Sequence, residues 1–331
     1  MGIPYQSATR GATARRRKRV ALVTTSWPTT EGDPSGHFVR TEARALRDAE
    51  NEVVVVAAGD AKAGTRSFSA GIDVIPVPSW GAFGWPGVLW RLREHPFRTL
   101  GAAHWVTAAR DALRHAGPFD RIVAHWVVPS AWPVSISEHT PLELVSHGAD
   151  VRLLQAMPAA VRERVVRALI ERAERWRFVA EHLRDGLAAS LRPALAAEVL
   201  GLAAIDPAPI DVPDVRAEAV HKRALMGPLP FATCVGRLVA SKRVDLAIAT
   251  AAREGLRLVV VGDGPDRDRL ERLAKREGAL VRFVGLVDRT EALAWMAASD
   301  ELFFASEAEG LSTVLREAEA LGVVVRTLHD E

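Results

Sequence analysis

The sequence lacks the features that define several common classes of protein. It has one cysteine, Cys234, in 331 residues, which excludes an internal disulfide. No run approaches the roughly 18 to 20 uninterrupted apolar residues of a membrane helix, because Arg, Glu or Asp interrupts every candidate. A hydrophobic content of 48% with 25% charged residues excludes a disordered, collagen-like or disulfide-stapled chain. We therefore expect a reduced, soluble cytoplasmic protein, whose length favours two domains.

Positive charge is concentrated at one end. The formal net charge is +2, yet residues 1–19 carry six basic side chains and no acidic one. Removing six positive charges from +2 leaves −4, so the rest of the chain is mildly acidic, which argues against a nucleic-acid partner. The first interpretation of residues 1–19 is a disordered tail, and the second is a tether to anionic lipid at the inner face of the membrane. A secretory signal is disfavoured because the apolar run 20–25 is short and is followed by Trp27 and Pro28.

Several motifs of common enzymes are also missing. The chain has no G-x-x-x-x-G-K-[ST] phosphate loop, no H-E-x-x-H zinc helix and no G-x-S-x-G nucleophile elbow. Ten histidines are scattered without the spacing of metal ligands. We therefore predict neither a metal site nor a bound cofactor.

Short β-branched runs alternate with amphipathic stretches through the first 205 residues, as in a doubly wound α/β sheet. Four consecutive valines within 52–58 are typical of a parallel strand buried on both faces. The expected strands are 20–25, 52–58, 72–77, 122–125, 142–146 and 177–180, and the expected helices are 38–48, 100–114 and 161–175.

The same alternation restarts in the second half. The expected strands are 231–235, 256–261, 281–284 and 302–305, each followed by a helix. Between the halves, five prolines in 206–230 predict an irregular linker. The sequence thus predicts an α/β protein with two Rossmann-like domains, 20–205 and 231–331, that face a cleft. Ligands bind beyond the carboxyl ends of the strands in such sheets, so the loops after them are the places to search.

A pair of cations follows the first strand of the second half. Arg237 and Lys242 lie between strand 231–235 and a helix expected to begin at Val244. Arg237 can donate a planar fork to two oxygens, Lys242 supplies a compact charge, and a helix start favours anions. Two solvated surface cations are the alternative.

A glycine turn follows the next strand. Gly262 and Gly264 lie between strand 256–261 and a polar helix. The pair alone is weak evidence, because glycines ordinarily turn a strand into a helix. The third glycine of a dinucleotide fingerprint is missing, which disfavours a nicotinamide site.

Two glutamates flank the start of the last helix. Glu309 is expected in the loop after strand 302–305, Ser312 at the helix cap and Glu317 about one turn inside it. The cap offers N–H groups to an anion, and carboxylates accept hydrogen bonds from hydroxyl groups. Lone glutamates at a helix start are more often dipole partners. Behind the Arg/Lys pair, however, the assembly fits a sugar joined to a nucleotide by a diphosphate. The loop between the glutamates adds Gly310 and Leu311 as donor-binding candidates.

Together these residues resemble the donor site of GT-B retaining glycosyltransferases of family 4, whose hallmark is E-x7-E. Landmarks of the first half agree with that family's first strand, glycine loop and next two motifs: 20–25, Trp27-Pro28, 33–40, His125-Trp126 and 147–150. The resemblance covers most of the chain from residue 20 to about 325.

The resemblance implies donor-site roles. Arg237 and Lys242 would neutralise the diphosphate, as a divalent metal does in other glycosyltransferases. Glu317 would hold the ribose hydroxyls and Glu309 the transferred sugar, while Gly36 would let backbone approach the diphosphate from the other domain.

The resemblance also implies a reaction. The departing phosphate oxygen would accept the acceptor's proton on the same face of the sugar, which gives retention without a protein nucleophile. Fixed cations would stabilise the charge left on that phosphate. His147 would touch the sugar or stabilise charge at the reacting centre, and its alternative is a hydrogen-bonded histidine at a strand end. The predicted catalytic residues are His147, Glu309, Arg237 and Lys242.

The acceptor side is less defined. The resemblance places it in the first domain, where His125, Trp126 and Trp85 are weak candidates. The aromatic, glycine-rich loop 80–87 precedes a basic amphipathic turn at 89–93. This region would suit a glycan, a lipid-linked acceptor or an aromatic small molecule, with contact at a membrane surface. Simple packing of the aromatics within the domain is the other interpretation.

The end of the sequence departs from the family pattern. Similar proteins continue beyond the E-x7-E helix through a proline-containing strand, a glycine loop and a final helix, whereas 320–331 has no proline and stops. We therefore expect a truncated C-terminal domain whose sheet lacks an edge strand and exposes apolar surface, with reduced stability or pairing with another chain. Arg243 replaces the usual glycine after Lys242 and is expected to crowd the phosphate site.

Three functions fit these residues. The favoured one is a hexosyltransferase that takes a nucleotide sugar and a hydroxyl acceptor as partners. The second is a catalytically silent GT-B protein that binds a nucleotide or a partner. The third is an epimerase that converts the nucleotide sugar with no acceptor present.

Overall fold

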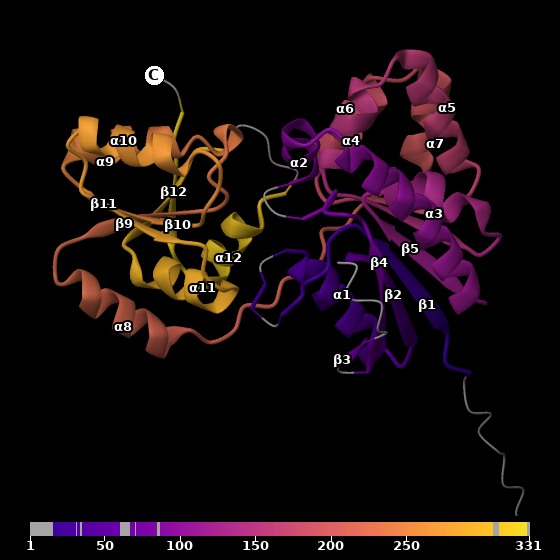
Figure 1. Ribbon diagram of the computed structural model, residues 1–331, viewed down its shortest axis with the longest axis horizontal. Helices are drawn as coiled ribbons and strands as arrows, with labels where there is room; N and C mark the ends of the chain where they lie inside the picture. The colour runs from indigo at the N-terminus through magenta and orange to yellow at the C-terminus, as the bar shows by residue number, and fades with distance from the viewer. Residues whose placement is uncertain are drawn as a thin grey trace, which may run out of the picture.

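A computed structural model describes residues 16–30, 32–33, 35–59, 67–69, 71–84, 87–306 and 311–329. The chain folds into two α/β domains side by side, each built on its own sheet (Figure 1). The two-domain parallel-sheet architecture predicted from the alternation of strands and helices is confirmed. The expected basic tail lies outside the described residues, apart from 16–19.

The N-terminal domain contains an eight-stranded sheet in the order β3-β4-β2-β1-β5-β6-β7-β8, parallel except for β3. Its strands are β1 Arg19–Thr24, β2 Glu52–Gly59, β3 Ser67–Ser69, β4 Ile72–Pro78, β5 Arg121–His125, β6 Leu142–Ser146, β7 Ala173–Phe178 and β8 Ala203–Ile205. Its helices are α1 His37–Asp48, α2 Val88–Glu94, α3 Arg98–Ala116, α4 Ala149–Ala156, α5 Ala159–Ile170, α6 Glu181–Ala189 and α7 Pro193–Leu202, with the short helical segments η2 Val127–Val134 and η3 Ser135–Ser137.

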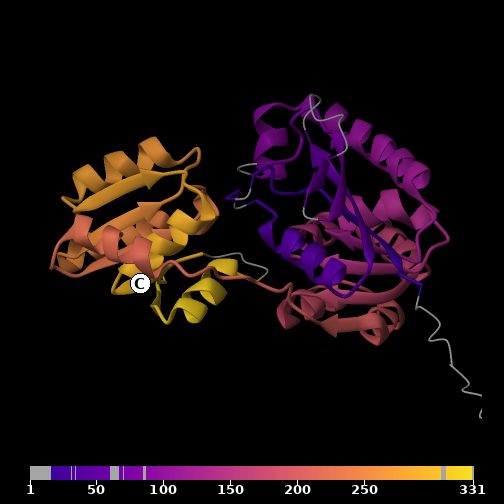
Figure 2. The same ribbon diagram turned by 90° about the horizontal axis from the view of Figure 1, so that it is seen from below.

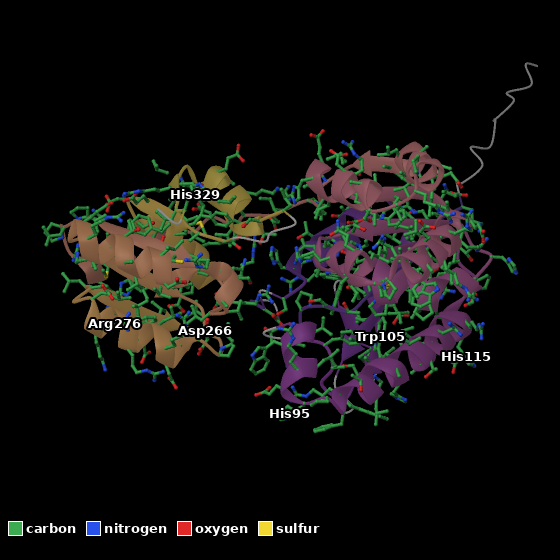
Figure 3. All side chains as sticks on the ribbon, turned by 90° about the horizontal axis from the view of Figure 1, so that it is seen from above. His95, Trp105, His115, Asp266, Arg276 and His329 are labelled. Carbon is green, nitrogen blue, oxygen red and sulfur yellow. The ribbon has the colours of Figure 1, made fainter. Side chains whose placement is uncertain are left out.

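Alternate residues of β1 enter two cores on opposite faces of this sheet. Val20 and Leu22 belong to the core under α1, whereas Ala21 and Val23 belong to the core that contains Trp105 of α3. Trp105 is labelled in Figure 3. Because helices cover both faces, the strand is apolar at each position from Val20 to Val23, and its hydrophobic run therefore shows no alternation.

The C-terminal domain contains a five-stranded parallel sheet in the order β11-β10-β9-β12-β13. Its elements are α8 Arg216–Met226, β9 Phe231–Val235, η4 Ala240–Lys242, α9 Val244–Glu254, β10 Arg257–Val261, α10 Arg267–Arg276, β11 Val281–Gly285, α11 Arg289–Ala298, β12 Glu301–Phe304, α12 Thr313–Leu321 and β13 Val324–Thr327. Figure 2 shows the chain crossing once from the first domain into α8.

The prediction of an irregular linker over 206–230 is wrong for its central part. Helix α8 occupies Arg216–Met226, and its buried Ala219 packs in a core with Phe231 and Trp295. The five prolines lie before and after this helix, and the stretch between them consists largely of good helix formers. Proline content averaged over the segment therefore concealed a helix that belongs to the C-terminal domain.

The boundaries after residue 161 also differ from the prediction. Helix α5 ends at Ile170 instead of Arg175, and β7 begins at Ala173 instead of Arg177. Strand β7 carries three charged side chains, so its sequence resembles an exposed helix more than a buried strand. Cross-strand packing decides the matter, because Trp176 is fully buried and donates a hydrogen bond of 3.0 Å to Ser146 Oγ.

Strand β13 forms one edge of the second sheet. It pairs in parallel with β12, and Val324 is 65% exposed. Apolar exposure at this end agrees with the expectation. The absence of a further strand beyond β13 stays a prediction.

Candidate functional site at the domain interface

The loops after β9 and β10 pack backbone against backbone. A Cβ atom on Gly262 would overlap the carbonyl oxygen of Gly236, and one on Gly264 would overlap that of Leu238. Leu238 N in turn donates to Asp263 O at 2.8 Å. Glycine at these positions therefore fixes the loop that carries Arg237. Direct contact of Gly262 and Gly264 with a donor stays a prediction.

Arg237 reaches across to the N-terminal domain. Its Nη1 lies 2.7 Å from the position that a Cβ on Gly87 would occupy, at the residue that precedes α2. Gly87 has φ of 140°, a backbone conformation that favours glycine. Glycine also leaves the space that the guanidinium occupies, so the close approach depends on glycine for both reasons. The predicted phosphate-binding guanidinium therefore lies at the interface of the two domains.

Lys242 lies at the end of η4 and lines a small cavity with the carboxyl ends of β9 and β12 and the start of α12. Ser306 and Ser312 also line it. Burial raises the pKa of the neighbouring Cys234 thiol to about 12, against the opposing charge of Lys242. The thiol is therefore protonated and inert at neutral pH.

The backbone conformation of Arg243 accounts for the glycine that is usual at this position. Its φ is 48°, in the left-handed region that favours glycine, and its Nε lies 3.3 Å from Asp245 Oδ2. The expected crowding of the phosphate site by this side chain stays a prediction.

Helix α12 begins beside the cavity. Ser312 is its cap residue and is buried, although its side chain makes no capping hydrogen bond. Leu311 packs against the hydrophobic core of the N-terminal domain, and its predicted contact with the donor stays a prediction. Glu309 and Gly310 lie outside the described residues, so their roles stay predictions.

Glu317 is buried inside α12, about one turn from its start, as predicted. Its Oε1 accepts a hydrogen bond of 2.8 Å from Arg289 Nε and lies 3.6 Å from His37 Nε2 of the other domain. Burial raises the pKa of Glu317, and the positive charge of Arg289 opposes that rise. Sequence reasoning missed Arg289 because it lies 28 residues away on a different helix.

The loop after β1 brings the N-terminal domain to this glutamate. Gly36 has φ of 68°, and a Cβ there would come within 2.5 Å of Ser26 O, so glycine lets the loop fold tightly into α1. Backbone also joins the domains, because Arg289 N donates to Gly32 O at 2.8 Å. Approach of Gly36 to a diphosphate stays a prediction.

His147 follows β6 and is half-buried in a group of rings. Its ring centroid is 5.0 Å from that of Phe38 and 4.6 Å from that of Trp126. Its Nε2 lies 3.0 Å from His125 Nδ1. The structure therefore brings together three residues predicted separately, His125, Trp126 and His147. Their roles toward sugar or acceptor stay predictions.

Asp150 holds this group in place. It is buried, and its carboxylate accepts three backbone hydrogen bonds of 3.0 Å, from Val127, His147 and Gly148. Burial raises its pKa, and those hydrogen bonds oppose the rise. The side chain thereby joins the loops after β5 and β6.

The aromatic side chains of the loop after β4 differ in their burial. Phe83 packs edge-on against buried Trp105 at 5.2 Å between centroids, as the packing interpretation expects. Trp80 is 57% exposed and stacks on His104 at 4.5 Å. Trp85 lies outside the described residues, so its acceptor role stays a prediction.

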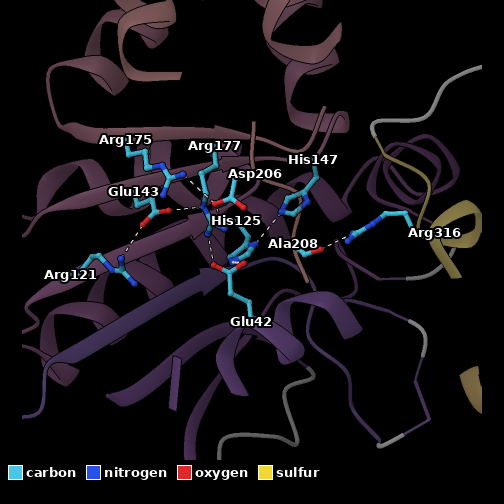
Figure 4. Close-up of polar contacts among 10 residues, drawn as sticks. All are labelled: Glu42, Arg121, His125, Glu143, His147, Arg175, Arg177, Asp206, Ala208 and Arg316. Atoms are coloured by element: carbon cyan, nitrogen blue, oxygen red, sulfur yellow. Dashed lines mark hydrogen bonds and ion pairs between the residues drawn. The ribbon is translucent and has the colours of Figure 1, made fainter. Parts of the chain in front are cut away.

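A buried charged cluster lies behind His125 (Figure 4), and no motif in the sequence predicted it. Arg177 of β7 forms ion pairs with Glu42 of α1 and with Glu143 of β6, the latter at 2.6 Å, and all three side chains are buried. His125 Nε2 lies 3.7 Å from Glu42 Oε2. These residues come from four separate elements, so no spacing in the sequence could have revealed the cluster.

The two-domain architecture matches the GT-B fold of several solved structures. Sucrose-phosphate synthase from Thermosynechococcus elongatus superimposes with a TM-score of 0.68 at 22% identity, over 94% of this chain and 81% of that one. Anabaena HepE in complex with UDP-glucose gives 0.67 at 17% identity, over 94% and 80%.

A family model matches the C-terminal part of the sequence. Residues 216–327 match the model of the family described as glycosyl transferases group 1. A GDP-mannose-dependent alpha-mannosyltransferase of Mycolicibacterium smegmatis is 32% identical over 114 residues. That match covers 34% of this chain and only 29% of the relative's length. Among the described residues, no helix is both long and apolar enough to cross a membrane.

Proposed function

We propose that this protein is a retaining hexosyltransferase that moves a sugar from a nucleoside diphosphate donor to a hydroxyl acceptor without a metal ion. One observation carries the proposal, namely that two consecutive residues connect the predicted donor and acceptor sides. His37 lies 3.6 Å from Glu317 of α12, and Phe38 packs against His147 at 5.0 Å between ring centroids. The residues predicted to hold ribose and sugar are therefore parts of one interface.

Charge at that interface suits a diphosphate. Arg237 and Lys242 follow β9, which is next to β12 in the sheet, and α12 begins with its N–H groups at the cavity that Lys242 lines. A guanidinium, an ammonium and a helix start each stabilise phosphate oxygens. In the proposed reaction they stabilise the negative charge that grows on the leaving phosphate as the anomeric bond breaks.

The departing phosphate would also remove the acceptor's proton. Its oxygen lies on the face from which the sugar leaves, so attack by the acceptor hydroxyl on that face forms the new bond with retained configuration. The chain's own residues then need only to orient the donor, neutralise its phosphates and exclude water.

The matched relatives make GDP-mannose the first donor to test, since that is the donor in the printed name of the mannosyltransferase. UDP-glucose and ADP-glucose follow, because similar folds are described with UDP-glucose and with ADP. A hydroxyl acceptor, either a glycan or a lipid-linked or aromatic molecule, would bind beside Trp126, which is partly exposed, whereas His125 is fully buried behind it.

Calorimetry with these donors, followed by product analysis with mixed acceptors, tests the proposal. Arg237→Ala should weaken binding of the preferred donor about 10- to 100-fold, the usual range for a hydrogen bond to a charged group. Arg276→Ala is the matched control, since it removes an exposed positive charge of the same domain from the last turn of α10 and should leave affinity unchanged. Undiminished affinity in Arg237→Ala would refute the phosphate contact.

Turnover distinguishes the three candidate functions. Glycoside formed with the donor's anomeric configuration, and formed equally in the presence of EDTA, supports the proposal. Tight donor binding without any product would identify a silent protein, and altered donor without acceptor would identify an epimerase.

A further inference from the structure

The buried side chains behind His147 form a line of hydrogen-bonding groups that ends at the proposed sugar site. Glu42, His125 and His147 follow one another with separations of 3.7 Å between Glu42 Oε2 and His125 Nε2, and 3.0 Å between His125 Nδ1 and His147 Nε2 (Figure 4). The two imidazole planes are nearly parallel, at 16°. Only His147, at the end of the line, is partly exposed.

The Glu42 end of this line holds two buried polar atoms that lack a hydrogen bond. Glu42 Oε2 and His125 Nε2 are both buried without a hydrogen-bond partner among the described residues, and they face each other. Arg177 donates a hydrogen bond to Glu42 Oε1 and so holds the carboxylate in position. A small approach of the two atoms would satisfy both, and burial makes the unsatisfied state costly.

Elementary hydrogen-bond chemistry then fixes every proton in the line. A carboxylate in an ion pair with a guanidinium accepts hydrogen bonds, so the oxygen that faces His125 favours a proton on His125 Nε2. A neutral imidazole has a single N–H, so His125 Nδ1 is an acceptor and His147 must donate from Nε2. His147, also neutral, is left with a lone pair on Nδ1. Burial favours these neutral forms, because it lowers the pKa of both histidines.

We propose that Glu42 and His125 are positioning residues that hold His147 in its Nε2–H tautomer, so that His147 Nδ1 accepts a hydrogen bond from a hydroxyl group of the bound sugar. The contact with the sugar rests on the proposed function, whereas the order of protons does not. A second-layer carboxylate that selects a histidine tautomer is a general device for orienting an imidazole.

The chain offers a matched pair of variants. Glu42 and Glu143 both pair with Arg177 and both are buried, but among the contacts of these two carboxylates only those of Glu42 include His125. Glu42→Gln lets an amide donate to His125 Nε2 and so permits the reversed order of protons. Glu143→Gln removes the same charge beside Arg177 without touching the line.

Nitrogen-15 NMR of histidine-labelled protein measures the tautomers directly, without any ligand. At neutral pH His147 should carry its proton on Nε2 in the native protein and in Glu143→Gln, whereas Glu42→Gln should show a mixture. A proton on His147 Nδ1 in the native protein would overturn the proposal, even if Glu42→Gln does not fold. Equal spectra for the two variants would overturn it as well.

Kinetics separate this proposal from the proposed function. Glu42→Gln should lower kcat about three- to ten-fold, the size expected for one hydrogen bond, and Glu143→Gln should not. If His147 shows the predicted tautomer but the protein turns over no nucleotide sugar, the positioning role stands and the proposed transferase function is refuted. If the protein turns over a nucleotide sugar but His147 shows the opposite tautomer, the transferase function stands and the positioning role is refuted.

Discussion

Two buried glutamate–arginine pairs occupy different places in this molecule. Glu42 and Arg177 lie inside the N-terminal domain, where Glu143 and His125 surround them. Glu317 and Arg289 lie in the C-terminal domain at its border with the other domain, beside His37. The first pair is enclosed by the sheet of its own domain. The second faces the other domain, where the proposed function puts the ribose of the donor. We therefore expect loss of the first pair to reduce stability and loss of the second to reduce affinity.

The largest effect should come from breaking the enclosed pair. Arg177→Ala removes the arginine partner of buried Glu42 and leaves Glu143 with Arg121 alone, so the free energy of unfolding should fall by about 3–5 kcal/mol. Urea denaturation followed by circular dichroism measures this. Arg175→Ala, on the same strand but with a half-exposed side chain, should cost less than about 1 kcal/mol. Equal losses would show that enclosure does not distinguish Arg177.

Acid should weaken the same cluster through its histidines. Burial lowers the pKa of His125 from 6.5 to about 3, and Arg177 adds to the effect. The unfolded chain therefore binds this proton at higher pH than the folded chain does. The contribution of neutral His125 to the free energy of unfolding is complete above pH 6.5 and is lost as the pH falls toward 3.

One such histidine contributes a slope of about 1.4 kcal/mol per pH unit in that window. Glu42, Arg177 and His147 face His125, and His147 adds a second contribution of the same sign. His125→Asn should reduce the slope of the free energy of unfolding against pH, between pH 6.5 and 3, by the contribution of about one proton. An unchanged slope in thermal melts across that range would contradict the buried neutral histidine.

The interface pair should respond in affinity more than in stability. Glutamine keeps the shape of Glu317 but carries no charge, and burial, which raises the pKa of Glu317, opposes the charge of the carboxylate. Glu317→Gln should therefore change the free energy of unfolding by less than about 1 kcal/mol, while donor affinity falls about ten-fold through loss of a charged hydrogen-bond acceptor. Calorimetry and melts on one sample measure both. Large destabilisation with intact affinity would make Glu317 a structural residue like Glu42.

The smallest effect should come from a residue outside both pairs. Arg243→Gly relieves a positive φ of 48° but removes the ion pair with Asp245. We expect a net stabilisation of about 0.5 kcal/mol, since the left-handed conformation costs a non-glycine residue about 1–2 kcal/mol. Destabilisation in urea titrations would show that the ion pair outweighs the strain.

The positions of the proposed donor-site residues could largely be predicted from the sequence, because these residues are close together along the chain. Arg237 and Lys242 share one strand-to-helix loop, and Glu317 lies in the first turns of α12 as expected. Helix α8 was missed because the prolines around it dominated the composition. Arg289, Glu42 and Arg177 were missed because each is one charged residue on an otherwise ordinary element.

The sequence alone determined which segments become strands with loops rich in glycine and charge, because hydrophobic period and turn chemistry are local properties. Tertiary structure alone decided which distant charges meet. Arg177 meets Glu42 from 135 residues away because β7, β6 and α1 pack at one sheet, and His37 meets Glu317 because two domains face each other. Burial then sets the pKa of each group, and burial depends on the whole fold rather than on neighbours in the chain.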